Sequence, residues 1–425
     1  MFVAFFLNCS MLKRLLNKQT LNLGVYGIGQ AFNLITPLLV IPYIVGICGE
    51  DGYGKTAVGM ALSFFLMVFI DYGSDIVGVK SVSVSRDDPK KLSQIFATTY
   101  LAKFFTLSLV LIAASLMFLF IPFFSVEKRL FFLGLPVLLG QCVNPTWFLQ
   151  GVENFKWITI LTIISKTIYV VGVFLMISNP EDYIYNNLVW GIGMIVAHLI
   201  VVGYLFTQYP IRFSDANRHD VKTLLRSNFS IFSSQIFVSL QMYAPTMLIS
   251  FFGGNALTGQ FKIVDQIVVI FKTYILLFFN FVFPRICYLL EIDKHQGLLF
   301  WKRYNGANFA FIALSMVAIF IFATPIVSYF NPKGIGEIVF LLRIAVAIPL
   351  LQAVTVPLKQ LMLGWDKQKE YVRYTMIITI VSLLAIVLAI PFFHVQGLLC
   401  VLIATEILSS ALFFASVKSN FFLRG

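Results

Sequence analysis

Hydrophobic residues form long runs along the chain, separated by short polar segments. The run at 107–124, for example, contains no charged residue. Such runs lie near 21–44, 57–79, 95–120, 130–150, 158–178, 187–206, 229–252, 260–283, 305–330, 337–363, 374–393 and 397–417. A helix needs about 20 apolar residues to cross a bilayer, whereas barrel strands alternate apolar and polar residues. The pattern therefore predicts an all-α membrane protein with about twelve transmembrane helices.

The composition agrees with a chain that is solvated by lipid. Of its 425 residues, 59% are hydrophobic and 12% are charged, against roughly 25% charged residues in soluble proteins. The net charge of +12 is spread in small groups rather than gathered in a basic domain, so nucleic acid is not an expected partner. The five cysteines and four histidines show no spacing typical of disulfides, metal sites or catalysis. We expect neither a cofactor nor a metal.

The basic residues between the predicted helices indicate the orientation of the chain. With the N-terminus inside, the cytoplasmic junctions and termini hold 21 Lys and Arg residues, at 13–18, 80–91, 156, 212–226, 285–303, 367–373 and 418–424. The opposite loops hold four, namely Lys55, Lys128, Arg129 and Lys333. Cytoplasmic loops are normally the more basic. We therefore predict that both termini are cytoplasmic.

The first residues, 1–10, are apolar but too short to span a membrane. They lack the basic start and the small-residue cleavage site of a signal peptide. One hypothesis is that the true start is Met11.

The predicted helices divide into two halves. The longest loop, near 207–226, suggests a cytoplasmic segment at 1–20, six-helix bundles at 21–206 and 229–417, a linker at 207–228 and a tail at 418–425. Gln30 precedes Gly54 by 24 residues, and Gln235 precedes Gly259 by the same number. Both halves begin on the same side, so the predicted repeat is parallel and suits two bundles around a central cavity.

Residues 49–56 read GEDGYGKT and match the phosphate-binding pattern G-x-x-x-x-G-K-[ST]. That loop requires a buried strand before it and a helix after it in an α/β domain. Here the segment joins two predicted membrane helices on the outer side. We interpret it as a tight turn rich in glycine.

Polar residues recur at helical spacing inside several predicted spans, and each is costly in hydrocarbon. These stripes comprise Asn22, Tyr26, Gln30 and Asn33; Thr159, Thr162, Lys166 and Tyr169; Asn228, Gln235, Ser239 and Thr246; and Lys262, Asp265, Gln266, Lys272, Thr273 and Asn280. We expect them to line an interior pathway. For the Ser, Thr and Asn members, packing between helices is an equal alternative.

The charged members of the spans suggest the cargo. Six bases stand against four acids, a balance that favours an anionic cargo and disfavours cationic drugs. We assign the substrate pathway to Lys166, Lys272, Arg343, Gln30, Asn33, Gln235 and Tyr169. Arg343, near the outer end of its helix, has a snorkelling alternative. Candidates for ion coupling are Asp71, Asp75, Asp265 and Glu406, with structural ion pairs or helix caps as the alternative.

Three segments resemble the polysaccharide transporter branch of the multidrug/oligosaccharidyl-lipid/polysaccharide (MOP) exporter superfamily, and O-antigen flippases in particular. Residues 49–54 with 71–73 resemble its first loop and second helix, and 324–344 resembles its passage from the ninth to the tenth helix. The most specific segment, 144–156, reads NPTWFLQGVENFK. Its residues that match the family signature are Pro145, Trp147, Gln150, Gly151 and Glu153.

The resemblance implies a MATE-like pair of six-helix bundles and no enzymatic activity. Such a protein would flip an undecaprenyl-pyrophosphate-linked O-antigen repeat unit across the bacterial inner membrane, in lipopolysaccharide biosynthesis. Expected partners are the lipid-linked oligosaccharide, membrane lipid, an O-antigen polymerase and a chain-length regulator. The alternatives are a multidrug or cation antiporter of the same superfamily and, from another class, a membrane O-antigen polymerase or ligase. The latter enzymes usually carry a long external loop, and every predicted external loop here is short.

Overall fold

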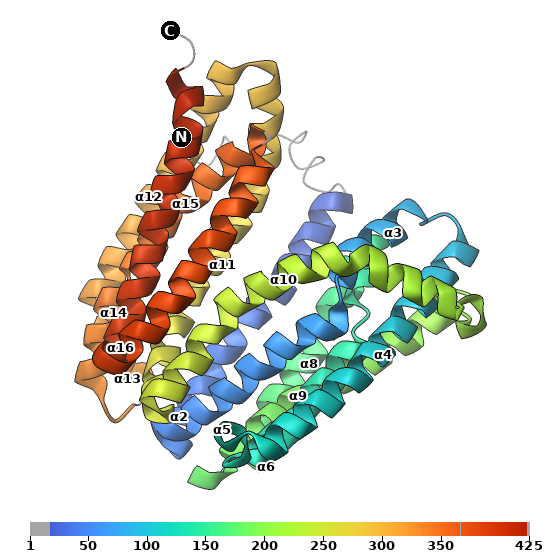
Figure 1. The fold of residues 1–425 in the computed structure, drawn as a ribbon, viewed down its shortest axis with the longest axis horizontal. Helices are drawn as coiled ribbons and strands as arrows, with labels where there is room; N and C mark the ends of the chain where they lie inside the picture. Colours follow the sequence, from blue (N-terminus) through green and yellow to red (C-terminus); the bar gives the residue numbers. More distant parts are fainter. Residues whose placement is uncertain (1–17, 331, 366, 423–425) are drawn as a thin grey trace, which may run out of the picture. The chain divides into compact units, whose positions relative to one another are not determined.

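The computed structural model describes residues 18–422 except 331 and 366, with side chains from Gly27 to Lys418. The proposed start at Met11 lies outside the described residues. Throughout the described part, the chain is helical and contains no strand (Figure 1). The elements are α2 Lys18–Asp71, η2 Ser74–Gly78, α3 Val79–Val84, α4 Pro89–Phe120, α5 Pro122–Ser125, α6 Lys128–Val143, α7 Thr146–Gly151, α8 Phe155–Met176, η3 Pro180–Ile184, α9 Tyr185–Gln208, η4 Phe213–Asp215, α10 Arg218–Gly253, α11 Asn255–Ile292, α12 Lys294–Ile321, α13 Ala323–Tyr329, α14 Ile335–Ala345, α15 Ala347–Gly364 and α16 Gln368–Phe422.

Ten helical stretches of the described chain are long and apolar enough to cross a membrane. Two of them contain a break in the helical backbone. α2 breaks at Gly49, with φ 70° and ψ 179°, and α16 breaks at His394, with φ 48° and ψ −133°. If each is counted as two, the stretches comprise twelve helical segments, in agreement with the hydropathy pattern. The prediction of an all-α polytopic membrane protein is confirmed.

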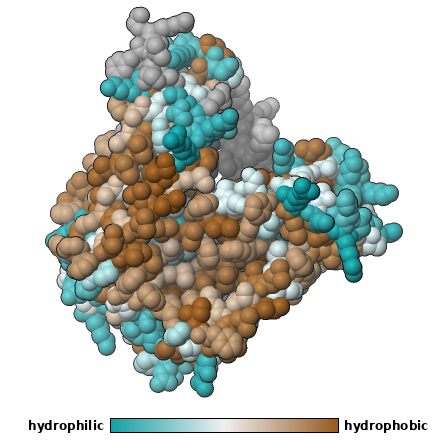
Figure 2. Space-filling model, in the orientation of Figure 1, coloured by the Kyte–Doolittle hydropathy of each residue, from teal (hydrophilic) through white to brown (hydrophobic). Residues whose placement is uncertain are grey.

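Large apolar side chains cover the outside of these helices. On α4, Leu109, Ile112 and Leu116 are each more than half exposed, and so are Leu384 and Leu388 on α16. Figure 2 shows broad hydrophobic areas over the helices, with hydrophilic residues gathered toward their ends. In water this surface would be a strong aggregation hazard, whereas hydrocarbon accommodates it.

The chain packs into two compact units. Unit 1 contains the described residues up to Val40 and Leu62–Ser239, and unit 2 contains Ile41–Ala61 and the described residues from Leu240 onward. Unit 1 has a core around Phe96, Trp147 and Phe148, and unit 2 has one around Ile286 and Met362. The first helical hairpin therefore contributes its tip to unit 2, and α10 contributes its first part to unit 1. The division into membrane bundles at 21–206 and 229–417 stays a prediction.

Two glycine pairs in unit 2 have the same five-residue spacing. Gly254 adopts φ 88° and ψ 173°, close to the conformation of Gly49, and each glycine separates two helical segments. Gly54 and Gly259 follow these breaks at the same distance, five residues further on. The two hairpins thus share a local design, which supports a parallel repeat in this part of the chain. Only Gly49 breaks the helix, and residues 50–56 form the start of the following helical segment rather than the predicted tight turn. No strand precedes them among the described residues, so the segment lacks the context of a nucleotide-binding loop.

Candidate functional site

Lys166 lies near the middle of α8, a helix that begins after Asn154. The Asn154 side chain accepts a hydrogen bond from the backbone N–H of Trp157 at 3.4 Å and so caps the helix. The Lys166 Nζ atom lies 3.6 Å from the ring centroid of Trp190 on α9. Tyr169, three residues after Lys166, lies edge-on to the same ring at 4.8 Å between centroids. Residues at this spacing share a helix face, so the predicted stripe of α8 is formed at these two positions.

Buried amides continue this cluster into α9. The Tyr169 hydroxyl donates to Asn186 Oδ1 at 2.9 Å, and Asn186 Nδ2 donates to Asn187 Oδ1 at 3.0 Å. The indole N–H of Trp190 is buried without a hydrogen-bond partner among the described residues. No described carboxylate forms an ion pair with Lys166. The cluster therefore offers a positive charge and one unused donor, the Trp190 indole N–H, beside an aromatic surface, which suits an anionic ligand with hydroxyl groups.

A second charged cluster lies on α11 in unit 2. Lys262 Nζ is 2.6 Å from Asp265 Oδ2, and Lys272 Nζ is 4.0 Å from Asp265 Oδ1. Nearby, Glu406 of α16 accepts a hydrogen bond from Gln352 of α15 at 2.9 Å. Asp265 thus lies between two lysines, as the spacing predicts. Lys272 is only loosely paired, because 4.0 Å is the outer limit of an ion pair.

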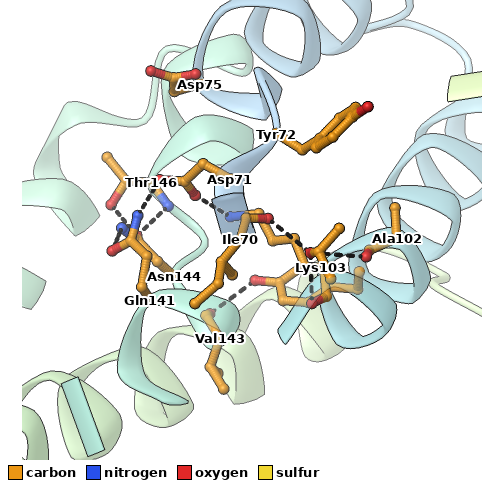
Figure 3. A network of polar contacts seen from close by, with 12 residues as sticks. Ile70, Asp71, Tyr72, Asp75, Ala102, Lys103, Gln141, Val143, Asn144 and Thr146 are labelled. Atoms are coloured by element: carbon orange, nitrogen blue, oxygen red, sulfur yellow. Dashed lines mark hydrogen bonds and ion pairs between the residues drawn. The ribbon is translucent and has the colours of Figure 1, made fainter. Parts of the chain in front are cut away.

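Asp71 anchors a polar network in unit 1 (Figure 3). Its two carboxylate oxygens accept from Lys103 Nζ at 2.9 Å and from Gln141 Nε2 at 2.6 Å. Gln141 in turn accepts from Asn144, which is the first residue of the 144–156 motif, at 3.2 Å. The Lys103 side chain is only 3% exposed. The buried Lys103 therefore neutralises Asp71 in a structural ion pair.

Asp75 has a different environment from Asp71, although they are four residues apart. It lies in the π-helical turn η2, which follows two positive-φ residues, Tyr72 and Gly73. Gln235 Nε2 on α10 donates to both Asp75 oxygens, at 2.9 and 2.8 Å, and no described base forms an ion pair with Asp75. Single π-turns are frequent at functional sites. Asp75 is therefore the stronger of the two candidates for a group that changes its charge.

A cavity of about 300 Å³ adjoins this turn in unit 1. Its lining includes Ser74, Gln94, Thr98 and Asp220. The hydroxyls of Ser74 and Thr98 are buried and have no partner among the described residues. Buried hydroxyls in a polar cavity normally bind water, so water can reach the residue next to Asp75.

The 144–156 motif packs against the end of the second membrane helix. A Cβ added to Gly151 would lie 2.5 Å from the Val82 side chain, and one added to Gly78 would lie 2.8 Å from the Trp147 ring. Beyond them, Arg86 forms an ion pair with Glu153 at 3.0 Å. This hydrogen-bonded pair raises the pKa of Arg86. The motif thus holds the turn that carries Asp75.

The motif residues differ in burial. Pro145 is buried and precedes α7, whereas Gln150 is only partly buried and uses its carbonyl to accept from the Glu153 N–H. Glu153 adopts a positive φ of 58°. These positions shape the backbone of the turn and add no charged group to the Lys166 cluster.

Four predicted pathway residues do not join either lysine cluster through a described contact: Gln235, which bonds to Asp75, and Arg343, Gln30 and Asn33. Arg343 on α14 is exposed, with its guanidinium 5.3 Å from the Phe320 ring. Gln30 and Asn33 are partly buried on α2. The neighbouring Gly29 packs on Thr159 of α8, where an added Cβ would lie 3.3 Å from the Thr159 hydroxyl. That Gln235, Arg343, Gln30 and Asn33 line a pathway stays a prediction.

The sequence profile described as "Polysaccharide biosynthesis protein" matches residues 20–289, more than half of the chain. The chain belongs to this family.

Curated relatives and solved structures extend the match over nearly the whole chain. A protein provisionally named an O-antigen transporter from Escherichia coli (strain K12) is 24% identical over 92% of this chain and 94% of its own. One with the same name from Shigella dysenteriae is 21% identical, over 91% and 96%. An inward-facing MATE-family multidrug transporter of the MOP superfamily superposes with TM-score 0.74 at 13% identity, over 93% and 98% of the chains. The lipid II flippase MurJ does so with TM-score 0.73 at 15% identity, over 92% and 87%.

This member of the polysaccharide biosynthesis protein family therefore has the fold of the MOP transporters. The named relatives and the structural neighbours are transporters or a flippase, which agrees with the expectation of a non-enzymatic protein. The sequence reasoning missed Trp190, Gln141 and the pairing of Lys103. Trp190 lies near a predicted helix end, where tryptophan commonly marks the membrane interface. Its contact with Lys166 depends on how α8 and α9 pack.

Proposed function

We propose that this chain flips an undecaprenyl-pyrophosphate-linked O-antigen repeat unit across the bacterial inner membrane by alternating access. The single observation that carries the proposal is Lys166, a lysine in the middle of an apolar helix that no described carboxylate neutralises. A buried ammonium is costly unless an anion, water or a ring face compensates it. The Trp190 ring provides part of that compensation, and a pyrophosphate can provide the rest.

The surroundings of Lys166 suit the remainder of such a substrate. Tyr169, Asn186 and Asn187 present hydroxyl and amide groups, which match the hydrogen bonds of sugars, and the indole offers a face for stacking. The polyprenyl tail needs no polar site, since it can stay in lipid. In unit 2, Lys272 adds a loosely paired positive charge. Arg343, Gln30, Asn33 and Gln235 are the further proposed pathway contacts.

The proposed topology has both termini in the cytoplasm and the repeat unit moving toward the periplasm. It rests on the excess of basic residues at one set of loops. Ion coupling is proposed at Asp75, with Asp265 and Glu406 as further candidates. A polymerase and a chain-length regulator are proposed partners. They are the proteins that would use the translocated unit.

The first rival is a multidrug or cation antiporter, which the MATE-like fold also accommodates. A cationic drug would be repelled by Lys166, which has no described acidic partner. The second rival is a periplasmic polymerase or ligase. Such an enzyme requires an external catalytic surface, and the described part of the chain consists of helices joined by short connections.

A leaflet-resolved assay in vesicles tests the proposal. Purified protein is reconstituted with the lipid-linked repeat unit, and the fraction reaching the opposite leaflet is measured over time. We expect transfer by the wild type and a loss of about tenfold or more in Lys166→Met, because a hydrogen bond to a charged group contributes about 1.5–3 kcal/mol. Lys156→Met, on an exposed residue in the first turn of α8, is the matched control. Unchanged transfer by Lys166→Met would contradict the assigned site, and absence of transfer by the wild type would contradict the function.

A further inference from the structure

Unit 2 contains a cavity of about 510 Å³. None of the residues of the two lysine clusters lines it. It lies where the first turns of α11 and α14 meet the break in α16. Its first and last lining residues in the sequence, Leu257 and Gln396, lie in predicted external loops. The polar lining residues are Gln260, Glu337, His394 and Gln396, and the aromatic ones include Phe340 and Phe392.

A hydrogen-bond network holds the acidic wall of this cavity in place. Gln260 Nε2 donates to Glu50 Oε2 at 3.0 Å and to Glu337 Oε2 at 3.3 Å. The backbone N–H of Gly334 donates to Glu50 Oε1 at 3.0 Å. Gln260 is itself only 8% exposed. Its amide oxygen and the second oxygen of Glu337 have no partner among the described residues. These acceptors are therefore oriented in advance and free to take hydrogen bonds.

A strained backbone segment of α16 also lines the cavity. His394 has φ 48° and ψ −133°, a combination that L-residues rarely adopt and that glycine tolerates better. Residues held in such conformations cluster at ligand sites, where the surrounding structure enforces them. His394, at the break, and Gln396, just after it, both line the cavity.

The charge of the lining restricts the ligand. No described lysine or arginine lines the cavity, while Glu337 contributes a negative charge. A pyrophosphate would therefore be repelled. A metal is also disfavoured, since no group of three or more His, Cys, Asp or Glu among the described residues can hold one. What the lining offers is a carboxylate, two amides, an imidazole and phenyl rings, which suit an uncharged ring with many hydroxyl groups.

We infer that this cavity is a binding site for a neutral saccharide of one or two sugar units, separate from the Lys166 cluster. Carboxylate and amide oxygens accept from sugar hydroxyls, and the C–H face of the ring packs against Phe340 or Phe392. The volume lies within the ordinary range of ligand pockets, about 300–1,000 Å³. That the bound saccharide belongs to the translocated repeat unit rests on the proposed function, whereas saccharide binding itself does not.

Saturation-transfer NMR and calorimetry on the purified full chain test the site, with lactose and N-acetylglucosamine as probes. We expect at least one of them to bind, and inorganic pyrophosphate not to displace it. Glu337→Gln keeps the size of the side chain but removes the charged acceptor, so it should weaken binding about tenfold. Gln396→Leu should weaken it as well. Gln208→Leu, on an exposed amide elsewhere, should leave it unchanged.

Each outcome is decisive for this site. Failure of both sugars to bind, displacement by pyrophosphate, or equal binding by the two cavity variants and the control would overturn the inference. Thermal unfolding of each variant shows whether it is folded. If the wild type binds sugar but fails in the leaflet-resolved assay, the saccharide site stands and the flippase proposal falls. If it translocates without binding free sugar, the reverse holds.

Discussion

Gly54 and Gly259 pack against each other's helices in unit 2. A Cβ added to Gly54 would lie 1.8 Å from the carbonyl oxygen of Asn255, and one added to Gly259 would lie 2.1 Å from that of Glu50. Each glycine thus contacts the residue that lies four positions before the other glycine in the sequence. The contact is reciprocal, as expected for two copies of one hairpin design that cross at a small-residue contact.

Replacement of either glycine by alanine should destabilise the protein. Here the clash is with backbone, which cannot rotate away, so we expect a cost of roughly 1–3 kcal/mol or more for Gly54→Ala or Gly259→Ala. Thermal unfolding in detergent measures it. The control is Gly306→Ala on α12, where an added Cβ meets nothing within 4 Å and the higher helix propensity of alanine should stabilise slightly. Equal stability of all three variants would contradict the packing.

The pair Asp71–Lys103 should behave as a structural ion pair. Lys103→Met leaves a partly buried carboxylate without its cation, and such changes cost up to about 3–5 kcal/mol when the pair is fully buried. The double variant Asp71→Asn/Lys103→Met should recover most of the loss, since no charge is then stranded. Unfolding temperatures of the single and double variants check this. Translocation by the double variant would exclude Asp71 as the coupling group. If the double variant folds but no longer translocates, the result would argue for a coupling role of Asp71.

Asp75 should be the residue that links transport to an ion gradient. Asp75→Asn keeps a side chain that can bond to Gln235 but cannot change its charge. We expect translocation that no longer responds to an imposed proton or sodium gradient, while the wild type responds. Glu406→Gln serves as a matched carboxylate-to-amide change in unit 2. If Asp75→Asn responds like the wild type and Glu406→Gln does not, coupling belongs to unit 2.

The break at His394 should be more stable with glycine. His394→Gly removes the side chain that makes positive φ unfavourable, and such conformations cost of order 1–3 kcal/mol. His394→Ala keeps a Cβ, so it should bring no such gain. Comparing the unfolding temperatures of the two variants separates backbone strain from loss of the imidazole. A higher unfolding temperature for the alanine variant would contradict the strain.

The sequence by itself determined the helical membrane class, the number of apolar segments and the stripe that contains Lys166 and Tyr169. These follow from local physics, because hydrocarbon requires long apolar helices and helical periodicity decides which residues share a face. The 24-residue spacing from Gln30 to Gly54 and from Gln235 to Gly259 likewise indicated the repeat that the glycine contacts support.

Only the tertiary structure decided which charges are neutralised. Asp71 and Asp75 look equivalent in the sequence, yet Asp71 meets Lys103, 32 residues away, and Asp75 meets Gln235, 160 residues away. In the same way, the tertiary structure places Lys166 over the Trp190 ring and lets Gln260 donate a hydrogen bond to Glu50. Charge pairing acts over a few ångströms in space, and helical periodicity says nothing about which distant helix provides the partner.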